Sequence, residues 1–355
     1  MRTKKGKMGI KIDVNFRPTV SLIVATYNEA VVIGKKLENI QKMDYPEDKL
    51  RVIIVDSASN DGTLEVCKDF LSKNRFRFPI QLISEKERSG KSHALNFALK
   101  HADGEIIATS DADSFWEQNA LGKAVAYFAD PSVGAVTGEE RIGNVNKSLH
   151  TMSEGIYRQF YYTLRLGESH IHSTLIFQGE LALYRRSAFN EFEERPGYSD
   201  DIGTVLNIVS DGYRCIFVPE AIFSDAAPFS LEGRLNLKSR RAKHLISGLL
   251  RSIKLKIKRK LPISFKVIFF NFFLQIISPI LFFLALCVTV LTYVFYVTSF
   301  WFLIFLLIPF FFRKPRVFAS SYLTSNVALI MGLLPVLTNR RSKIWNKVDE
   351  MREKT

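Results

Sequence analysis

The sequence predicts an α/β domain built on a parallel sheet, followed by helices that span a membrane. Three observations support this fold class. Short apolar runs alternate with segments of helical periodicity in the first third of the chain, and polar clusters follow three of those runs. Near the C-terminus, residues 267–312 contain no charged side chain. The protein therefore combines a sheet-based domain with a membrane anchor.

Short apolar runs are typical of buried parallel strands, because both faces of such a sheet are covered. We expect strands at residues 20–25, 51–56, 80–83 and 105–110. We expect helices at residues 31–43, 61–71 and 92–101. Since strands and helices alternate, the helices should cover both faces of one parallel sheet.

Polar clusters stand at the ends of three expected strands. They are Thr26-Tyr-Asn-Glu, Asp56-Ser-Ala-Ser and Asp111-Ala-Asp. Ligands of open α/β sheets bind beyond the carboxyl ends of the strands. The three clusters are therefore expected to line one crevice.

A change in composition near residue 230 divides the chain. We expect a basic N-terminal segment at 1–17, an α/β domain at 18–230, a basic interfacial helical segment at 231–262, a membrane domain at 263–338 and a basic cytoplasmic tail at 339–355. Eleven Lys or Arg lie between Arg234 and Lys260, directly before the charge-free run. Such clusters mark the cytoplasmic side and attract anionic headgroups, so the domain should lie in the cytoplasm at the cell membrane. The adjacent apolar run argues against a basic arm that binds nucleic acid.

The basic segment also carries a row of apolar residues at every fourth position, namely Leu245, Leu249, Ile253 and Ile257. This spacing suits a helix that lies in the membrane interface. The alternative is an ordinary surface helix of the domain.

The membrane domain is expected to hold two or three hydrophobic segments. A bilayer span takes roughly 20 apolar residues, so 267–312 fits two spans. The run 317–338 is shorter and includes Asn326, Gly332 and Pro335. Because the tail is basic, we expect this last run to be re-entrant or interfacial, with the tail inside. A third span is the alternative.

The pair Asp111 and Asp113 suits a hard divalent cation. Two carboxylates one residue apart at a strand end can reach the same Mg²⁺ or Mn²⁺ ion, whose other sites are filled by substrate phosphate oxygens. Such an ion neutralises the charge that develops on a leaving diphosphate. A solvated turn is the structural alternative, because Asp-x-Asp is common.

Three further positions suggest how a nucleotide is bound. Asp56 ends a buried strand and can accept a hydrogen bond from a base or ribose, although a turn or cap role is the alternative. Asp61 is better explained as the cap of the next helix. Lys91 lies in a basic loop before a helix, where phosphate contact is expected. A P-loop is excluded because Glu85 stands where its first Gly is required.

Ser199-Asp200-Asp201 follows a Pro-Gly break and precedes an amphipathic helix. Paired acids at such a break can supply a general base for an acceptor hydroxyl. A helix cap is the alternative, and one Asp can cap while the other acts.

These motifs together resemble the family-2 inverting glycosyltransferases, which have a GT-A (Rossmann-like, nucleotide-diphospho-sugar transferase) fold. The resemblance covers about residues 18–250 and points to the membrane-bound branch with hyaluronan, cellulose and chitin synthases and exopolysaccharide enzymes. The motifs that carry it are Thr26-Tyr-Asn-Glu, Asp56-Ser-Ala-Ser-Asn-Asp-Gly-Thr, Arg88-x-Gly-Lys with Ala94-Leu-Asn, Asp111-Ala-Asp, Gln178-Gly-Glu-Leu-Ala-Leu-Tyr-Arg-Arg and Ser199-Asp-Asp.

The resemblance implies a role for each matching residue. Asp113 would coordinate the metal, and Asp201 would be the catalytic base. The donor side would comprise Thr26, Tyr27 and Glu29 around the nucleotide, Asp56 at the base, Lys91 near the donor and Asp111 at the sugar or ribose. The acceptor side would comprise Gln178, Gly179, Glu180 and Asp200.

The chain departs from the family pattern at the membrane gate. Processive synthases carry Gln-x-x-Arg-Trp there, whereas this chain has Arg240, Arg241, Lys243 and His244 in the matching segment. The basic character suits diphosphate contact, but His244 replaces the Trp that helps to hold the acceptor. Together with the small number of spans, this favours single addition over processive polymerisation.

The sequence therefore predicts a metal-dependent glycosyltransferase that moves a sugar from a nucleotide-diphosphate sugar, with a UDP-sugar expected, to a lipid-linked or glycan acceptor. A processive polysaccharide synthase is the first alternative. A non-catalytic membrane module that binds nucleotide sugars is the second, and the intact acids Asp111, Asp113 and Asp201 argue against it.

Overall fold

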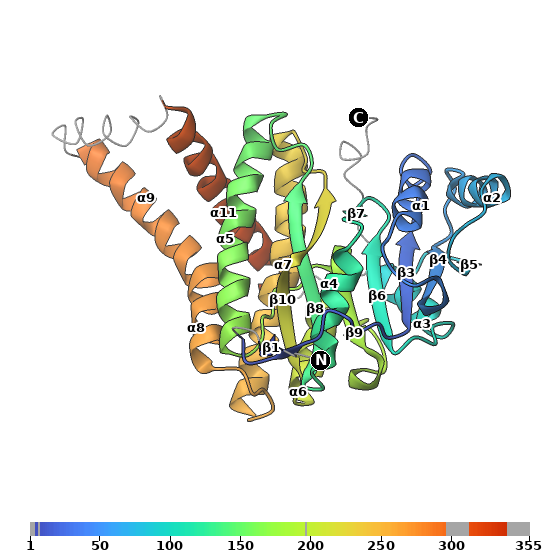
Figure 1. Ribbon diagram of the computed structural model, residues 1–355. Coiled ribbons are helices and arrows are strands. Elements are labelled where there is room, and N and C mark those ends of the chain that lie inside the picture. Colours follow the sequence, from blue (N-terminus) through green and yellow to red (C-terminus); the bar gives the residue numbers. More distant parts are fainter. Residues whose placement is uncertain (1–3, 6–7, 196, 296–311, 339–355) are drawn as a thin grey trace.

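The computed structural model describes residues 4–5, 8–195, 197–295 and 312–338. One eight-stranded sheet forms the centre of the molecule, and a group of long helices gathers at one end of it (Figure 1). The strand order is β5-β4-β3-β6-β9-β8-β10-β7. A two-stranded ribbon of β1 (Lys4–Lys5) and β2 (Lys11–Ile12) lies near the N-terminus.

Four strands form the parallel half of the sheet. They are β3 (Val20–Thr26), β4 (Leu50–Asp56), β5 (Ile80–Ser84) and β6 (Ile106–Asp111), and they pair with one another in parallel. The helices between them are α1 (Ile33–Gln41), α2 (Thr63–Lys73) and α3 (Lys91–Leu99). The strands and helices predicted for this half are confirmed, with ends that shift by only a few residues. Asp61 is not the cap of α2 as predicted, because the N-cap position is Gly62 and no side chain caps the helix. Asp61 lies just before it, and its Oδ1 accepts from Thr63 N at 3.0 Å.

The other half of the sheet is mixed, so the prediction of an all-parallel sheet was wrong there. It comprises β7 (Phe115–Trp116), β8 (Val133–Ile142), β9 (Ala182–Arg185) and β10 (Arg214–Asp225). Strand β9 runs antiparallel to both β6 and β8, and β7 runs antiparallel to β10. The sequence places α5 (Leu149–Ile171) between β8 and β9, and this long excursion lets β9 enter from the opposite direction.

Both faces of the sheet are covered, as predicted. Leu22 and Val24 of β3 belong to a core that includes Ile33 of α1, whereas Ile23 points into a second core with Ala94 of α3. This division follows from the alternation of side chains along a strand. The first core also takes in α4 (Ala120–Val125), and the second takes in α6 (Asp200–Ser210).

Helix α7 (Leu231–Ile257) spans most of the basic segment. Leu249 is buried in the second core, and Leu245 and Ile253 pack against that core. Three of the four residues in the predicted apolar row therefore face the α/β domain, as the surface-helix alternative requires. Ile257 is 76% exposed. An interfacial position for the whole helix stays a prediction.

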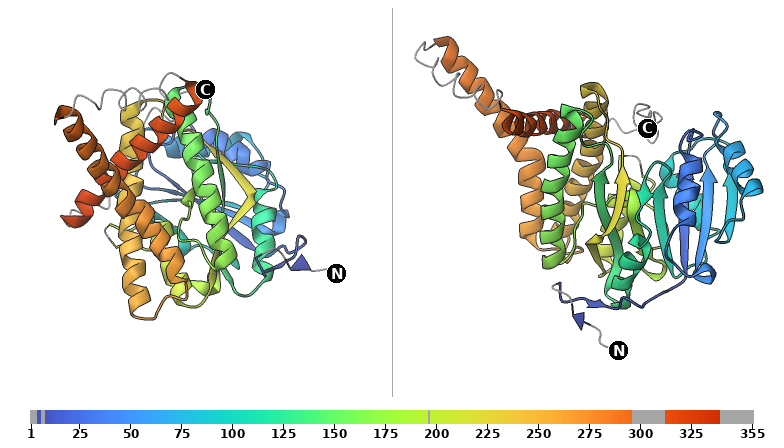
Figure 2. Two further views of the ribbon diagram at one scale, coloured as in Figure 1. Left: turned by 90° about the vertical axis from the view of Figure 1, so that its left-hand side faces the viewer. Right: turned by 45° about the horizontal axis from the view of Figure 1, so that its top comes forward.

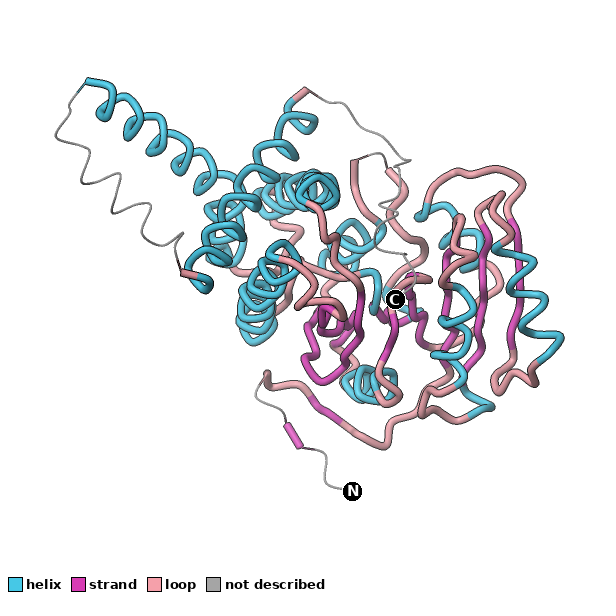
Figure 3. The backbone as a smooth tube through the Cα atoms, turned by 90° about the horizontal axis from the view of Figure 1, so that it is seen from above, coloured by secondary structure: helices cyan, strands magenta, loops and turns pink. Residues whose placement is uncertain are grey.

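The chain continues as one long helical rod that leaves the domain (Figure 2). It consists of α8 (Phe265–Phe272), a π-helical turn (Phe273–Ile277) and α9 (Ser278–Phe295). Its first part lies on α5, where Tyr161 and Gln275 exchange hydrogen bonds of 2.8 and 3.1 Å. Seen from above, the end of α9 projects away from the sheet (Figure 3).

Two helices in the described part of the chain are long and apolar enough to cross a membrane, judged by length and composition. They cover Phe265–Thr292 and Lys314–Leu337. The second span predicted within 267–312 falls largely on residues 296–311, outside the described residues, as does the tail at 339–355.

Helix α11 (Arg313–Leu337) contains the run predicted to be re-entrant or interfacial. It is one uninterrupted helix with Pro335 inside its last turn, so it lacks the break that a re-entrant segment needs. It packs on α5, where Ser321 Oγ donates to Ser153 O at 2.8 Å, and on α7 beside Ala242. A span and an interfacial helix both remain compatible with this geometry.

Candidate active site

A cavity of about 300 Å³ opens at the carboxyl end of the parallel half of the sheet. Its walls come from both halves of the molecule: the ends of β3 and β6, the start of α3, the segment before β9, the start of α6, and helices α5 and α7. The place agrees with the crevice that the strand-end clusters predict. Its size is at the lower end of the range for small-molecule sites.

All but two of the residues predicted for the site line this cavity. They are Thr26, Tyr27, Glu29, Lys91, Asp111, Asp113, Gln178, Gly179, Glu180, Asp200, Asp201, Arg240, Arg241 and His244. The two that do not are Asp56 and Lys243. Side chains from positions more than 200 residues apart are therefore brought to one place.

Asp56 is engaged by its own neighbours. Its carboxylate is 3% exposed and accepts hydrogen bonds from Ser59 N, Ser59 Oγ and Thr26 Oγ1, at 3.1, 2.5 and 3.3 Å. These contacts hold the turn after β4 against the end of β3. A role at the nucleotide base stays a prediction, and the observed role is structural.

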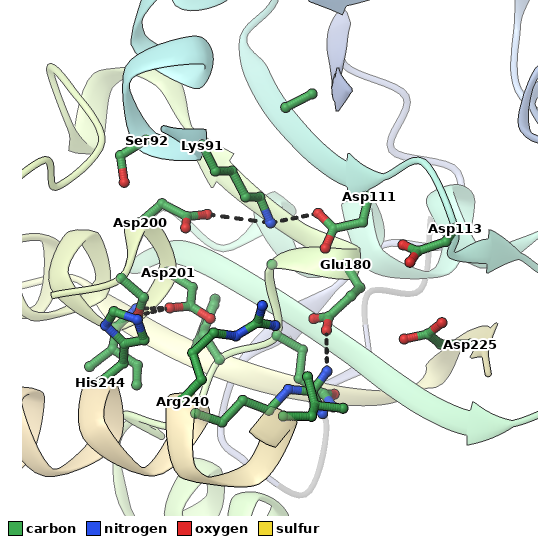
Figure 4. A pocket seen from close by; sticks show the side chains of 18 of the residues that line it. Lys91, Ser92, Asp111, Asp113, Glu180, Asp200, Asp201, Asp225, Arg240 and His244 are labelled. Atoms are coloured by element: carbon green, nitrogen blue, oxygen red, sulfur yellow. Dashed lines mark hydrogen bonds and ion pairs between the residues drawn. The ribbon is translucent and has the colours of Figure 1, made fainter. Parts of the chain in front are cut away.

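Lys91 lies between Asp111 and Asp200 in the cavity (Figure 4). Its Nζ lies 2.5 Å from Asp111 Oδ1 and 3.8 Å from Asp200 Oδ2. Burial opposes both charges, yet the pair lowers the pKa of Asp111 and raises that of Lys91, so both are ionised. Gly179 leaves room for this contact, because a Cβ there would lie 3.2 Å from Lys91 Nζ.

Asp111 ends β6 and Asp113 lies in the turn after it, and Asp225 at the end of β10 faces the same region (Figure 4). Burial raises the pKa of Asp225, and the Asp113 carboxylate raises it further. Among the described residues, no group of three or more His, Cys, Asp or Glu is arranged to hold a metal by itself. The set nevertheless fits Mg²⁺ or Mn²⁺, since these ions take one or two carboxylates and complete their shell with water and substrate phosphate.

The Ser199-Asp200-Asp201 triplet opens α6. Asp201 accepts from Ser199 Oγ and, at 2.6 Å, from Ile202 N. Burial and the neighbouring Asp200 carboxylate raise the pKa of Asp201 to about 7. The helix-cap alternative concerned the two acids. The N-cap position itself is Ser199, which makes no side-chain cap, whereas Asp201 accepts from a backbone N–H of the first turn. A carboxylate with this pKa can take a proton near neutral pH.

Helix α7 supplies the basic wall predicted as the gate. Arg241 pairs with Glu180 at 2.9 Å, and this contact joins α7 to the segment before β9. Burial and the charges of Arg240 and Lys243 lower the pKa of His244 to about 4, so its imidazole is neutral. The Nδ1 atom of His244 is buried without a hydrogen-bond partner in the described structure.

Comparisons with known proteins decide the family. Residues 21–192 match the family model described as Glycosyl transferase family 2. The mannosyltransferase PcManGT from Pyrobaculum calidifontis, solved in complex with GDP-Man and Mn²⁺, is 32% identical and has a TM-score of 0.80. The alignment covers 93% of this chain and 90% of that protein.

This chain belongs to glycosyl transferase family 2. The resemblance inferred from the sequence motifs and the GT-A fold are both confirmed.

Curated relatives of this family-2 glycosyltransferase include polymer-forming synthases. The poly-β-1,6-N-acetyl-D-glucosamine synthase of Staphylococcus epidermidis is 26% identical over 271 residues, which is 76% of this chain and 63% of that protein. The Staphylococcus aureus enzyme of the same name is 27% identical over 225 residues, 62% of this chain and 53% of that protein. The chain thus spans less than two thirds of the length of these relatives.

Several residues of this family-2 site carry no sequence signal. Tyr157, Arg158 and Arg165 of α5 line the cavity, and Arg165 donates to Gln178 Oε1, which helps to orient that predicted side chain. Their partners lie on other elements, so no local motif marks them. Lys36, by contrast, stands between Ile33 and Ile40 on the buried face of α1, and a charged residue on an apolar stripe could have been noticed.

Proposed function

We propose that this protein transfers a sugar from a nucleoside-diphosphate sugar to an acceptor hydroxyl at a membrane, in one displacement that inverts the anomeric carbon. The observation that carries the proposal is the Lys91 bridge. It places the Asp111–Asp113 turn beside the Ser199-Asp200-Asp201 triplet within one cavity. A donor diphosphate and an acceptor hydroxyl can therefore meet there.

The donor diphosphate would lie on the turn after β6. Asp113, with Asp111, would hold Mg²⁺ or Mn²⁺, and the bound ion would offset the negative charge of the departing diphosphate. Lys91, Arg240 and Arg241 line the same cavity and add positive charge around the diphosphate. Tyr27 lies under the Arg88 guanidinium, 3.8 Å from the ring centroid, and both face the side where the nucleotide would enter.

Asp201 is the proposed general base. Its raised pKa keeps it basic enough to accept the hydroxyl proton, and one base on the acceptor side is what a single displacement requires. Asp200 is held by Lys91 instead, so the two acids have different roles. Ser199 donates to Asp201 and orients it.

The acceptor would approach from the side of α5 and α7. His244 can help to bind it, because a buried neutral Nδ1 without a partner can accept from a sugar hydroxyl. A histidine in place of the tryptophan of processive synthases favours one addition per binding event. A lipid-linked sugar or a growing glycan is the proposed acceptor, since α9 and α11 would hold the cavity near the bilayer.

A processive polysaccharide synthase is the second candidate. The curated relatives favour it, because both are synthases of a polymer. Gel analysis of the product formed from labelled donor separates the two candidates. A single band supports one addition, and a ladder supports processive synthesis.

The decisive experiment is a donor screen on purified full-length protein with Mn²⁺, in which released nucleoside diphosphate is measured. GDP-mannose is the first donor to test, because the 32% identical relative was solved with it. UDP-sugars, which the sequence motifs favour, are the second group. Release from one donor class supports the proposal, whereas binding without any release would leave a non-catalytic module.

We place the catalytic domain on the cytoplasmic side of the cell membrane. Phe269, Phe270 and Leu284 on the long rod are 48%, 58% and 56% exposed, which suits contact with lipid. The exposed basic side chains at and just after the end of α7 lie directly before this rod and would face the anionic inner leaflet; they are Lys254, Lys258, Arg259 and Lys260. Accessibility of a Cys at Ser342 to an impermeant reagent tests the orientation: reaction only after the membrane is opened supports a cytoplasmic tail.

A further inference from the structure

Lys36 is a buried lysine on a core-facing surface. Its side chain is 0% exposed and lies in α1 among Ile33, Leu37 and Ile40. A lysine is rarely buried completely unless specific partners hold it. Its contacts therefore indicate why this position is not apolar.

The Lys36 side chain forms hydrogen bonds with both ends of the turn that carries Asp111 and Asp113. Nζ donates to Ser110 Oγ and to Ser114 O, each at 2.6 Å. No ion pair found in the described part of the chain includes Lys36. Its close partners are thus the two residues that flank the turn, and neither is a carboxylate.

Asn39, one helical turn further along α1, holds the next part of the same segment. Its side chain donates to Trp116 O at 2.8 Å and accepts from Trp116 N at 2.9 Å. Residues three apart lie on one face of a helix, so Lys36 and Asn39 are neighbours on α1 and both form hydrogen bonds with this segment. Helix α1 thereby holds the chain from Ser110 to Trp116.

The clamped segment is also tied to the acceptor side. The carbonyl oxygen of Glu180 accepts from Ser110 Oγ, Ser114 Oγ and Trp116 Nε1, at 3.1, 3.2 and 2.9 Å. The carboxylate of Glu180 pairs with Arg241 of α7. Lys36 lies at the base of this buried polar cluster, so its loss would remove two of the hydrogen bonds that fix the turn.

We propose that Lys36 is a positioning residue for the metal and diphosphate site, acting by fixing the Asp111–Ser114 turn rather than by touching the substrate. This inference rests on the proposed function, in which Asp113 holds a divalent cation. Groups behind the ligands of a metal site commonly affect metal affinity about 10- to 100-fold.

The test is the affinity of full-length protein for Mn²⁺, measured from the electron paramagnetic resonance signal of free Mn²⁺, with GDP and UDP added in parallel. Lys36→Met leaves an unbranched side chain that is one atom shorter and removes both hydrogen bonds. We expect Mn²⁺ to bind about tenfold more weakly or worse. The matched control is Tyr45→Phe, which removes a buried hydrogen bond to Pro18 O in the same core but away from the turn.

The direction of the change is informative. Asp111, Asp113 and Asp225 are the acids that interact electrostatically with Lys36. If Lys36 mattered only as a positive charge near them, its removal would tighten Mn²⁺ binding, and that result would overturn the proposal. Affinity unchanged relative to Tyr45→Phe would also overturn it. If Lys36→Met does not fold, Ser110→Ala removes one of the two hydrogen bonds that Lys36 donates and should weaken binding by a smaller factor. No change there would equally contradict the proposal.

Two further proteins separate this proposal from the proposed function. Wild-type protein that binds no Mn²⁺ with either nucleotide would refute the metal site itself. Binding that Asp113→Asn abolishes but Lys36→Met leaves intact would refute only the role of Lys36.

Discussion

The two halves of the cavity are built in different ways. The donor half stands on β3, β4, β5 and β6, where each functional cluster directly follows a strand. The acceptor half combines the segment before β9 with the start of α6, and with α5 and α7, whose residues come from distant parts of the sequence. The first half is held mainly by the backbone ladder of parallel strands, and the second by side-chain contacts.

This difference shows where the chemistry depends on tertiary packing. On the donor side, strand pairing alone brings Thr26 beside Asp56 and Ala25 beside Asp111. On the acceptor side, Gln178 is held by Arg165 and Glu140, and Glu180 by Arg241. Lys91 and Glu180 are the residues that connect the halves, so variants on either side should have separable effects.

The largest effect is expected for Asp201→Asn in the acceptor half. Removing a general base should lower the transfer rate by about 100- to 10,000-fold. Because Asp201 would touch only the acceptor, the affinity for the donor should persist. Titration of the donor nucleotide and single-turnover transfer measure the two quantities. If donor affinity fell as steeply as the transfer rate, Asp201 would belong to the donor site instead.

Asp113→Asn tests the donor half and should have the next largest effect. Loss of one electrostatic stabiliser of the leaving group costs about 100-fold in turnover or more. The variant should still fold, because Asp113 stands in the turn after β6 rather than in the core, and thermal unfolding without metal checks this. Normal turnover of the wild type in a chelator would argue that no divalent cation takes part.

The contrast between the halves also explains what could be predicted from the sequence. Strands β3, β4 and β6 are buried on both faces, so they appear as apolar runs, and the acids that follow them can be placed from the sequence alone. The antiparallel β9 could not be placed, because Ala182-Leu-Tyr-Arg has no local feature that sets its direction.

The buried charged residues could not be predicted either, because their partners lie far away in the sequence. Arg165 is 1% exposed, yet its partners Glu139 and Gln178 lie on other elements. In α7, the apolar row was expected to face lipid, but the core of the domain competes for the same side chains and binds them. Periodicity identifies a buried face, whereas the surface that covers it depends on the tertiary fold.

The pH dependence of transfer should also distinguish the acceptor half from the donor half, with a smaller effect than the two substitutions above. Burial and Asp200 raise the pKa of Asp201 to about 7, so the active carboxylate is lost as the pH falls through that value. The acid limb of kcat/KM should therefore fall about tenfold per pH unit below about 7. Asp111, whose pKa is lowered with Lys91 beside it, should stay ionised over this range. A profile flat down to pH 5 would show that Asp201 titrates as an ordinary carboxyl group or is not the base.

The smallest effect is expected at the contact between the halves, the ion pair of Glu180 and Arg241. The exposed fractions of their side chains are 14% and 29%, so solvent screens the pair only in part. Glu180→Gln and Arg241→Gln should each lower turnover by about tenfold or less, since either change leaves one buried charge without its partner. If the pair acts as one connection between α7 and the turn after β6, the double variant should lose little more than either single variant, because the connection is broken only once. Turnover of all four proteins, measured at saturating donor, gives the coupling directly. Losses that multiply in the double variant would mean that Glu180 and Arg241 serve the two halves independently.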